Sequence, residues 1–265
     1  MNTIISNIIA IYRKELQSYF ASPLALAIAG AYWLISGFFF LYILLGPDGI
    51  LAQVAMREQL GITDPVDVPY QFLQFFLSVM GSLSLFFLPM LSMGLYAEER
   101  KRGTLELLAT SPLTNWSVAV GKLLGVLTFY LTMTAPFLLY ESILFSAADP
   151  KMPIVIPILG HLALILLAAS ILSLGMFISS LTENTFLSAI LTFALILFLW
   201  VMNGIAEGVT GAMGSAIGHL SLLKHYSNLI QGIIDSSSLI LFGSYIVLGI
   251  FLTAQSIEAL RYKRS

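Results

Sequence analysis

Few side chains in this 265-residue sequence could do acid–base or metal chemistry. There is no cysteine, which excludes thiol catalysis and cysteine-ligated metals. His161 has no plausible nucleophile close to it in sequence, and His219 and His225 are six positions apart, which does not align them on one helical face. The His-Glu-x-x-His pattern is absent, and all five Asp residues fall in predicted loops. We therefore predict neither a catalytic residue nor a metal site, and expect that the chain is not an enzyme.

The densest group of polar side chains is a run of five consecutive charges from Glu98 to Arg102. The run is followed by a turn, a short helix with an apolar stripe, and a proline that ends the helix. A simple positive anchor needs no second helix, so we interpret the segment as an element that docks in a groove on a partner protein. The residues expected to take part are Glu98, Glu99, Gly103, Thr104, Leu105, Glu106, Leu108 and Pro112.

The composition indicates the setting in which these residues work. Hydrophobic residues make up 58% of the chain and charged residues only 10%, whereas soluble proteins contain about 25% charged residues. Too little polar surface remains to cover a globule in water, so we predict an integral membrane protein. The net charge of −2 and the absence of a long basic tract give no indication of a nucleic-acid partner.

Six apolar segments are long enough to cross a bilayer as helices, which takes about 20 residues each. Turn-forming sequences such as Gly46-Pro47 and Asp149-Pro150 separate them. The predicted fold is an all-α polytopic bundle of six transmembrane helices within residues 24–257, followed by a tail over residues 258–265. The predicted spans are Leu24–Leu45, Tyr70–Leu95, Val118–Phe145, Ile158–Leu181, Phe186–Asn203 and Leu239–Ile257.

The basic residues predict the orientation of this bundle. Nine of the twelve Lys and Arg residues lie on the side that holds both termini, and three lie on the other side. Because Lys and Arg near helix ends favour the cytoplasmic face, both termini are predicted to be cytoplasmic, in a plasma (inner) membrane.

Two segments outside the spans have patterns of their own. Apolar side chains recur every three or four positions in residues 1–23, which predicts an amphipathic entry helix in the cytoplasmic interface with its apolar face in lipid. An ordinary flanking helix without a mechanical role is the alternative. Residues 205–238 mix apolar residues with several glycines, and for His219 and His225 in this segment we expect titration or surface hydrogen bonding.

Only two charged residues fall inside the predicted spans. Lys122 lies within a turn of the cytoplasmic end, so we expect its side chain to snorkel to water. Glu141 lies about one turn from the outer end of its span, and an intramembrane carboxylate is a functional hypothesis by default. It could reach the interface, pair within a dimer, or face a water-filled vestibule.

Three groups of residues together resemble the permeases of the ABC-2 family of ATP-binding-cassette transporters. In that family an acidic exit, a Gly-Thr-Leu-Glu sequence, a short apolar helix and a Pro precede a Gly-Lys pair. The matching residues here are Glu98-Glu99, Gly103-Thr104-Leu105-Glu106, Leu107-Leu108, Pro112 and Gly121-Lys122. Lys14–Leu16 and Tyr19–Pro23 resemble the entry helix of the family. Ser179–Thr185 resembles its turn between spans four and five. Within that family, the chain resembles the short bacterial permeases associated with gliding motility or copper-enzyme maturation.

The resemblance implies a transporter built from two permease halves, identical or related, and two cytoplasmic ATPase subunits. The Gly-Lys pair is followed by Leu123, so the chain lacks a phosphate-binding loop, and ATP and Mg would be bound on the ATPase partner. The short helix after Gly103 would dock in the ATPase, and the turn at Glu183 would be a second contact. Residues 205–238 would form a re-entrant outer gate.

In the family, spans one, two and five line the pathway at the interface between halves. These predicted spans contain no charged residue, which favours an apolar or amphipathic cargo, and we expect export. Tyr32, Phe39 and Phe76 are candidate pathway or gate residues, together with Glu141, although such aromatic residues also commonly face lipid or neighbouring helices.

A non-transporting role is the main alternative. The same docking helix would then pass ATPase motion to an extracytoplasmic partner protein, so that the chain acts as a membrane transmitter or anchor. The outer loop over residues 46–69 could contact such a protein, and a solvated loop is the simpler interpretation.

Overall fold

The computed structural model describes residues 2–62, 66–105, 113–148, 151–209, 211, 214 and 218–262, and this part of the chain contains helices and no strand. Six helices within it are long and apolar enough to cross a membrane. They are α2 (Pro23–Leu45), α4 (Val68–Ser92), α7 (Asn115–Ser146), α8 (Val155–Leu181), α9 (Thr185–Gly208) and α12 (Ser236–Tyr262). The predicted all-α fold with six spans is therefore confirmed.

Polar side chains and prolines fix where these helices begin. The Ser22 hydroxyl accepts a hydrogen bond from the amide of Ala25, and Pro23 occupies the first turn of α2, where its missing N–H costs nothing. The Asn184 side chain accepts from the first amides of α9 in the same way. The long helices begin within about four residues of the predicted positions, because both the apolar runs and these caps are local features of the sequence.

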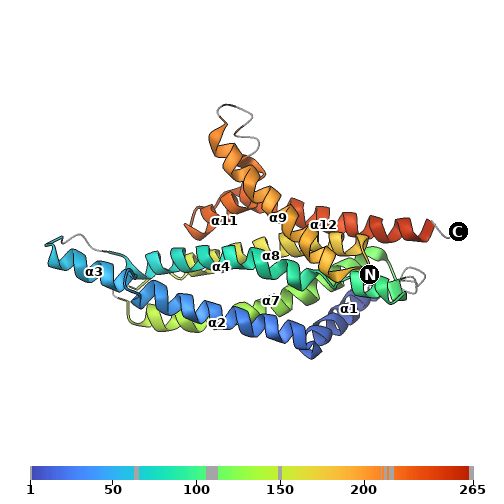
Figure 1. The fold of residues 1–265 in the computed structure, drawn as a ribbon, viewed down its shortest axis with the longest axis horizontal. Helices are drawn as coiled ribbons and strands as arrows, with labels where there is room; N and C mark the ends of the chain where they lie inside the picture. The colour runs from blue at the N-terminus through green and yellow to red at the C-terminus, as the bar shows by residue number, and fades with distance from the viewer. Residues whose placement is uncertain are drawn as a thin grey trace.

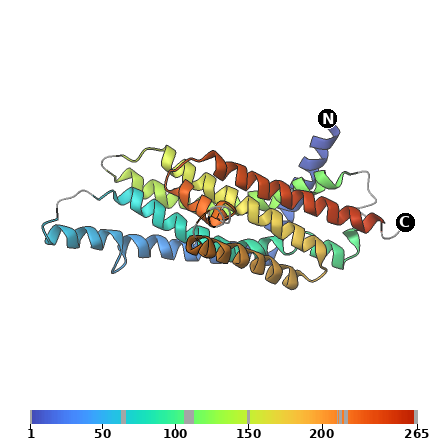
Figure 2. The ribbon, with the colours of Figure 1, turned by 90° about the horizontal axis from the view of Figure 1, so that it is seen from above.

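The long helices pack side by side around α8, which contacts α4, α7, α9 and α12 (Figures 1 and 2). Both chain ends lie at one end of the bundle, here called the terminal end, as an even number of spans requires. The opposite end, here called the far end, carries the short helix α3 (Ile50–Gln59), which lies beyond the long helices in Figure 1.

Helix α9 is the least buried of the six spans. Figure 1 shows its later part rising away from the other long helices. Large apolar side chains along it, among them Phe186, Phe198 and Trp200, are exposed on the single chain. In a membrane protein these side chains contact lipid or another chain.

The N-terminal helix α1 (Asn2–Ala21) packs against α7 rather than resting on lipid alone (Figure 1). The two backbones approach closely at glycines of α7: a Cβ at Gly121 would lie 2.8 Å from the side chain of Ile11, and one at Gly125 would lie 2.8 Å from Glu15. The prediction that the apolar face of this helix lies in lipid is therefore wrong for the part that meets α7. Ile4 and Phe20 remain exposed.

A short helix, α11 (Leu222–Ile230), lies alongside the spans within the segment predicted to be re-entrant. The Tyr226 phenol donates to the carbonyl of Leu77 near the middle of α4, and burial raises the pKa of Tyr226. His225 is buried, with Nδ1 bonded to Ser238 and Nε2 to the carbonyl of His219. The expectation of a surface role for His225 is thus wrong, because the sequence pattern did not reveal the burial of α11.

We predict that Gly121→Ala lowers the stability of the protein by about 1–3 kcal/mol, since the added methyl group would push Ile11 and the α1 backbone away from α7. The matched control is Gly30→Ala in α2, where a Cβ meets nothing within 4 Å and a small gain in helix stability is expected. Thermal unfolding in detergent measures both. Equal melting temperatures for the two variants would contradict close packing of α1 on α7.

Candidate functional site

A buried ammonium group organises the terminal end of the bundle. Lys122 of α7 is only 3% exposed, and its Nζ lies 3.1 Å from Glu15 Oε2, 3.0 Å from Glu99 Oε1 and 2.8 Å from the carbonyl oxygen of Leu95. The same nitrogen lies 5.0 Å from the centre of the Tyr96 ring. These residues are called the Lys122 cluster below. Moving an ammonium out of water costs several kcal/mol, and the two carboxylates and the carbonyl offset that cost.

The expectation that Lys122 snorkels to water is wrong. Its side chain stays inside the protein because acceptors from three elements surround it: Glu15 from α1, Leu95 from the chain just after α4, and Glu99 from α5 (Ala97–Lys101). The acceptor Glu15 lies 107 residues earlier in the chain, which explains why the sequence pattern around Lys122 gave no sign of it.

Helix α5 is fixed to the end of α8 by one hydroxyl group. Ser179 Oγ accepts hydrogen bonds from the amides of Tyr96 and Ala97 and donates to the carbonyl of Met93. It thereby satisfies backbone groups that the break between α4 and α5 leaves unpaired. Arg100 adds to this link by donating to the carbonyl of Ser180.

The structure brings together two of the segments expected to contact an ATPase. Arg100 Nε lies 3.6 Å from Glu183 Oε1, so the charged run and the turn between α8 and α9 are neighbours. Glu98 pairs with Arg102 at 3.5 Å, and both side chains are largely exposed. Glu99 instead points into the Lys122 cluster and Lys14 approaches it at 3.9 Å.

The remaining predicted docking residues lie at the end of the described segment. Gly103 has a φ of +69°, a left-handed conformation that permits the expected turn. The Thr104 hydroxyl donates to the carbonyl of Glu99. Leu105 is 2% exposed and belongs to the hydrophobic core, so its side chain packs within this chain in this conformation. Glu106, Leu108 and Pro112 lie outside the described residues.

The phenol of Tyr19 makes a further contact between α1 and the spans at the terminal end. Tyr19 donates a 2.6 Å hydrogen bond to the carbonyl of Leu91 at the end of α4. Burial, and secondarily the negative charges of Glu15 and Glu98, raise the pKa of Tyr19 well above its ordinary value. The phenol therefore stays neutral and keeps its proton for the carbonyl, which ties α1 to α4.

A second ionisable pair lies near the far end. Glu141 Oε1 of α7 lies 3.6 Å from His161 Nε2 of α8, and Glu141 is 3% exposed. His161 Nδ1 is bonded to the carbonyl of Pro157, an acceptor, so Nδ1 carries a proton. Of the three environments considered for Glu141, none included this partner in the same chain. The sequence did contain a sign of this contact. Glu141 lies near the end of one span and His161 near the start of the next, so the two side chains lie at similar depths in neighbouring antiparallel helices.

The candidate pathway residues lie mainly inside the core. Tyr32 is fully buried and its hydroxyl lies 3.0 Å from Ser84 Oγ, which in turn lies 2.7 Å from the Tyr130 hydroxyl. Phe76 is also fully buried, and Phe39 is partly buried. A cargo could contact Tyr32 or Phe76 only after the helices separate.

Comparison with known proteins gives one family. A family model described as ABC-2 family transporter protein matches residues 66–256, which includes α4 through most of α12. No curated protein sequence matches the chain. Among the residues that the structure describes, no three His, Asp or Glu side chains lie close enough together to hold a metal ion.

We predict that Lys122→Met lowers stability by about 3–5 kcal/mol, because it leaves the carboxylates of Glu15 and Glu99, only 13% and 18% exposed, without their buried cation. Adding Glu15→Gln and Glu99→Gln to this variant should recover most of the loss. Lys151→Met, at an exposed position near the far end, is the control. Chemical unfolding in detergent measures all four proteins, and an unchanged midpoint for Lys122→Met would contradict the role of the cluster.

Proposed function

Since this chain belongs to the ABC-2 family of transporter proteins, we propose that it forms one permease half of an exporter and that a separate cytoplasmic subunit hydrolyses the ATP. The six apolar helices make it a multi-pass membrane protein. ATP and Mg would be bound on the partner, and a second permease half, identical or related, would complete the membrane domain. Both termini would lie on the cytoplasmic side of a plasma (inner) membrane, where nine of the twelve basic residues fall.

The observation that carries the proposed coupling to an ATPase is the Lys122 cluster at the terminal end. It joins α1, α5 and α7 in one contact, directly beside the charged run. A force applied to α5 would therefore reach α1 and α7 together, since breaking the cluster would leave buried charges unpaired. An ATPase that binds the segment from Glu98 to Pro112 would act on this unit.

A second link would carry the motion to the other side of the bundle. Ser179 holds the start of α5 to α8, and Arg100 joins it to the turn that contains Glu183. Because α8 contacts α4, α7, α9 and α12, a tilt of its end would be passed to most of the spans. Transmission of this kind requires two arrangements of the helices whose populations the ATPase shifts.

The chemistry of the spans supports an apolar or amphipathic cargo. No charged residue lies in α2 or α4, nor in the spanning part of α9 over Thr185–Met202. An unpaired charge at membrane depth is costly, so a pathway without charges suits a cargo without charge at its centre. The exposed apolar side chains of α9 are available to a second permease half. Separation of α2 from α4 would expose Tyr32 and Phe76 to the cargo.

One observation favours the alternative of a transmitter that acts on an extracytoplasmic protein. Helix α3 lies beyond the long helices at the far end (Figure 1), and its Arg57 and Glu58 provide polar contacts for such a protein. The same lack of charge in the spans is compatible with this role. Transport remains the proposal because the matched family is one of transporters.

We predict that Arg100→Glu lowers the coupled ATPase rate of the reconstituted complex by roughly fivefold or more, because it places like charges at the contact between α5 and the Glu183 turn. The exchanged pair, Arg100→Glu with Glu183→Arg, should recover much of that rate. Lys151→Glu is the matched charge reversal away from this contact. If the single and exchanged variants hydrolysed ATP equally, the contact would have no role in coupling.

We also predict that an amphipathic cargo stimulates ATP hydrolysis by the complex in lipid vesicles that contain no other protein. Uptake of the cargo into inside-out vesicles should depend on ATP. Stimulation that appears only after an extracytoplasmic protein is added, without ATP-dependent uptake, would contradict transport and support the transmitter role.

A further inference from the structure

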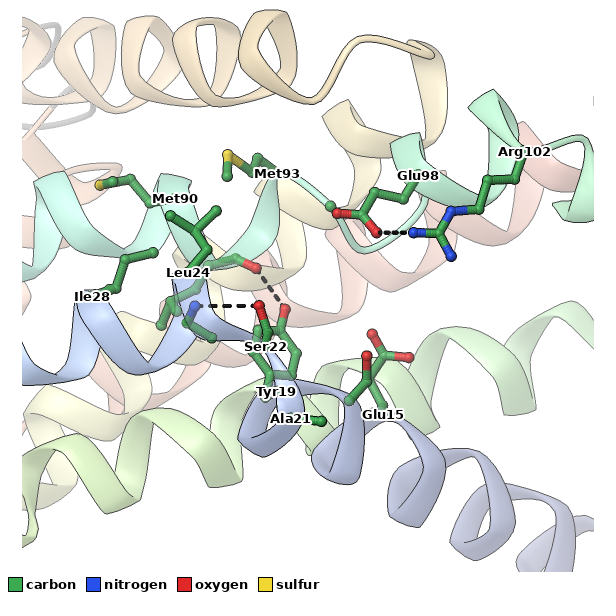
Figure 3. Close-up of a pocket in the computed structure, with 14 residues that line it drawn as sticks. Glu15, Tyr19, Ala21, Ser22, Leu24, Ile28, Met90, Met93, Glu98 and Arg102 are labelled. Carbon is green, nitrogen blue, oxygen red and sulfur yellow. Dashed lines mark hydrogen bonds and ion pairs between the residues drawn. The ribbon is translucent and has the colours of Figure 1, made fainter.

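A cavity of about 410 Å³ lies between α1, α2 and the junction of α4 with α5 (Figure 3). Its volume falls within the range of small-molecule sites, about 300–1,000 Å³. A second cavity of about 300 Å³ adjoins it and shares Glu15, Ser18, Gly94, Glu98 and Arg102 with it. The larger one is called the entry cavity below.

The two ends of the entry cavity differ in polarity. Leu24 and Ile28 of α2 and Met90 of α4 supply an apolar end, whereas Glu15, Glu98 and Arg102 supply a charged end (Figure 3). A ligand that fills the cavity must therefore be amphipathic, with hydrocarbon next to α2 and a polar group next to α1 and α5.

In a bilayer crossed by the six long helices, the cavity would lie at the level where headgroups give way to hydrocarbon. Its apolar residues occupy the first turns of α2 and the last turn of α4, at the terminal end of both spans. From Ser22 to Ile28 the helix rises about 9 Å, which covers the headgroup zone and the start of the acyl chains. Leu24 and Met90 are 52% and 41% exposed, so the apolar end is open to surrounding lipid.

The charged end has a mixed charge that a zwitterion complements. It carries the carboxylates of Glu15 and Glu98 and the guanidinium group of Arg102, and Glu15 also accepts from Lys122 through Oε2. Glu98 and Arg102 are paired only loosely, at 3.5 Å and in contact with solvent, so little free energy opposes their turning toward a ligand. A Cβ at Gly94 would lie 3.2 Å from Glu98 Oε1, so a glycine at this position leaves room for that carboxylate beside the backbone.

Two of the three neutral polar side chains that line the cavity already have hydrogen-bond partners. The Tyr19 phenol donates to the carbonyl of Leu91, and the Ser22 hydroxyl accepts from the amide of Ala25 (Figure 3). Ser18 and the charged side chains therefore remain for a ligand, and only the charged ones can distinguish one headgroup charge from another.

We propose that the entry cavity binds a zwitterionic phospholipid with a primary amine, whose ammonium group meets Glu15 and Glu98 and whose phosphate meets Arg102. The acyl chains lie against Leu24 and Met90 and continue into the bilayer. The lipid fills the space between α1 and the α4–α5 junction, and it is a resident ligand distinct from the transported cargo.

The charges explain the selectivity for this headgroup. A primary ammonium donates hydrogen bonds to carboxylates, and such charge-assisted bonds are about twice as strong as neutral ones. The quaternary ammonium of phosphatidylcholine has no N–H to donate. Phosphatidylglycerol has no cation in its headgroup, so it offers nothing that could pair with Glu98 or with the second carboxylate oxygen of Glu15.

Native mass spectrometry of the purified chain tests the proposal. The delipidated protein is incubated with equal amounts of phosphatidylethanolamine, phosphatidylcholine and phosphatidylglycerol that carry the same acyl chains. The wild-type chain should retain phosphatidylethanolamine in excess. Glu98→Gln should reduce that excess roughly fivefold, because it removes a charged acceptor of the primary ammonium. Arg102→Gln should instead reduce the retention of all three lipids, because the phosphate that it binds is common to them.

Two further variants separate loss of the site from loss of the fold. Glu58→Gln, exposed on α3 at the far end, removes the same charge outside the cavity and should retain the lipid. Met90→Trp fills the apolar end without changing a charge and should reduce retention of all three lipids. Equal retention of the three headgroups by the wild-type chain, an unchanged excess in Glu98→Gln, or unchanged lipid retention in Arg102→Gln would overturn the proposal.

The last arm distinguishes a resident lipid from cargo. If the complete complex moved labelled phosphatidylethanolamine across a vesicle bilayer on addition of ATP, the lipid would be cargo and its assignment as a resident ligand would be wrong. Retention is measured on the permease chain alone, so a failure of the transport proposal leaves the binding result unaffected.

Discussion

The burial of one ammonium group constrains the terminal end of this molecule. A Lys side chain that is 3% exposed must find acceptors within the protein, because its lost hydration is worth several kcal/mol. Glu15, Glu99 and the carbonyl of Leu95 provide them. The position of α1 on α7 and the position of α5 beside both helices follow from this requirement. The glycines of α7 then allow the close approach that brings Glu15 within reach.

The same contacts connect the helices of the terminal end so that they move as a unit. The Lys122 cluster joins α1, α5 and α7, and Ser179 with Arg100 joins α5 to α8 and the following turn. These are short, directional contacts among groups that are costly to leave unpaired, so the elements they connect move together more easily than they move apart. The proposed coupling to a separate ATPase would use such a connection, because the charged run proposed to bind that partner lies beside the cluster.

The sequence predicted the spans well and the polar contacts between them poorly. Apolar runs, caps such as Ser22 and Asn184, and turn residues are local features, and they place helix starts within a few residues. The partners of Lys122 and Glu141 depend on which helices are neighbours, which no local pattern contains. Two wrong predictions had the same cause. The sequence did not reveal that α1 packs against α7, so α1 was expected to lie in lipid and Lys122 was expected to reach water.

The ion cluster also has a consequence for synthesis. Glu15 emerges from the ribosome 107 residues before Lys122. At about 5–20 residues per second, it waits roughly 5–20 s for its cation. During that interval α1 has no glycine-lined surface to dock on, and its carboxylate is best left in the headgroup layer in contact with water. Folding of the terminal end is therefore completed only after the third span has entered the membrane, and α1, although made well before α7, takes its final place only once α7 is present.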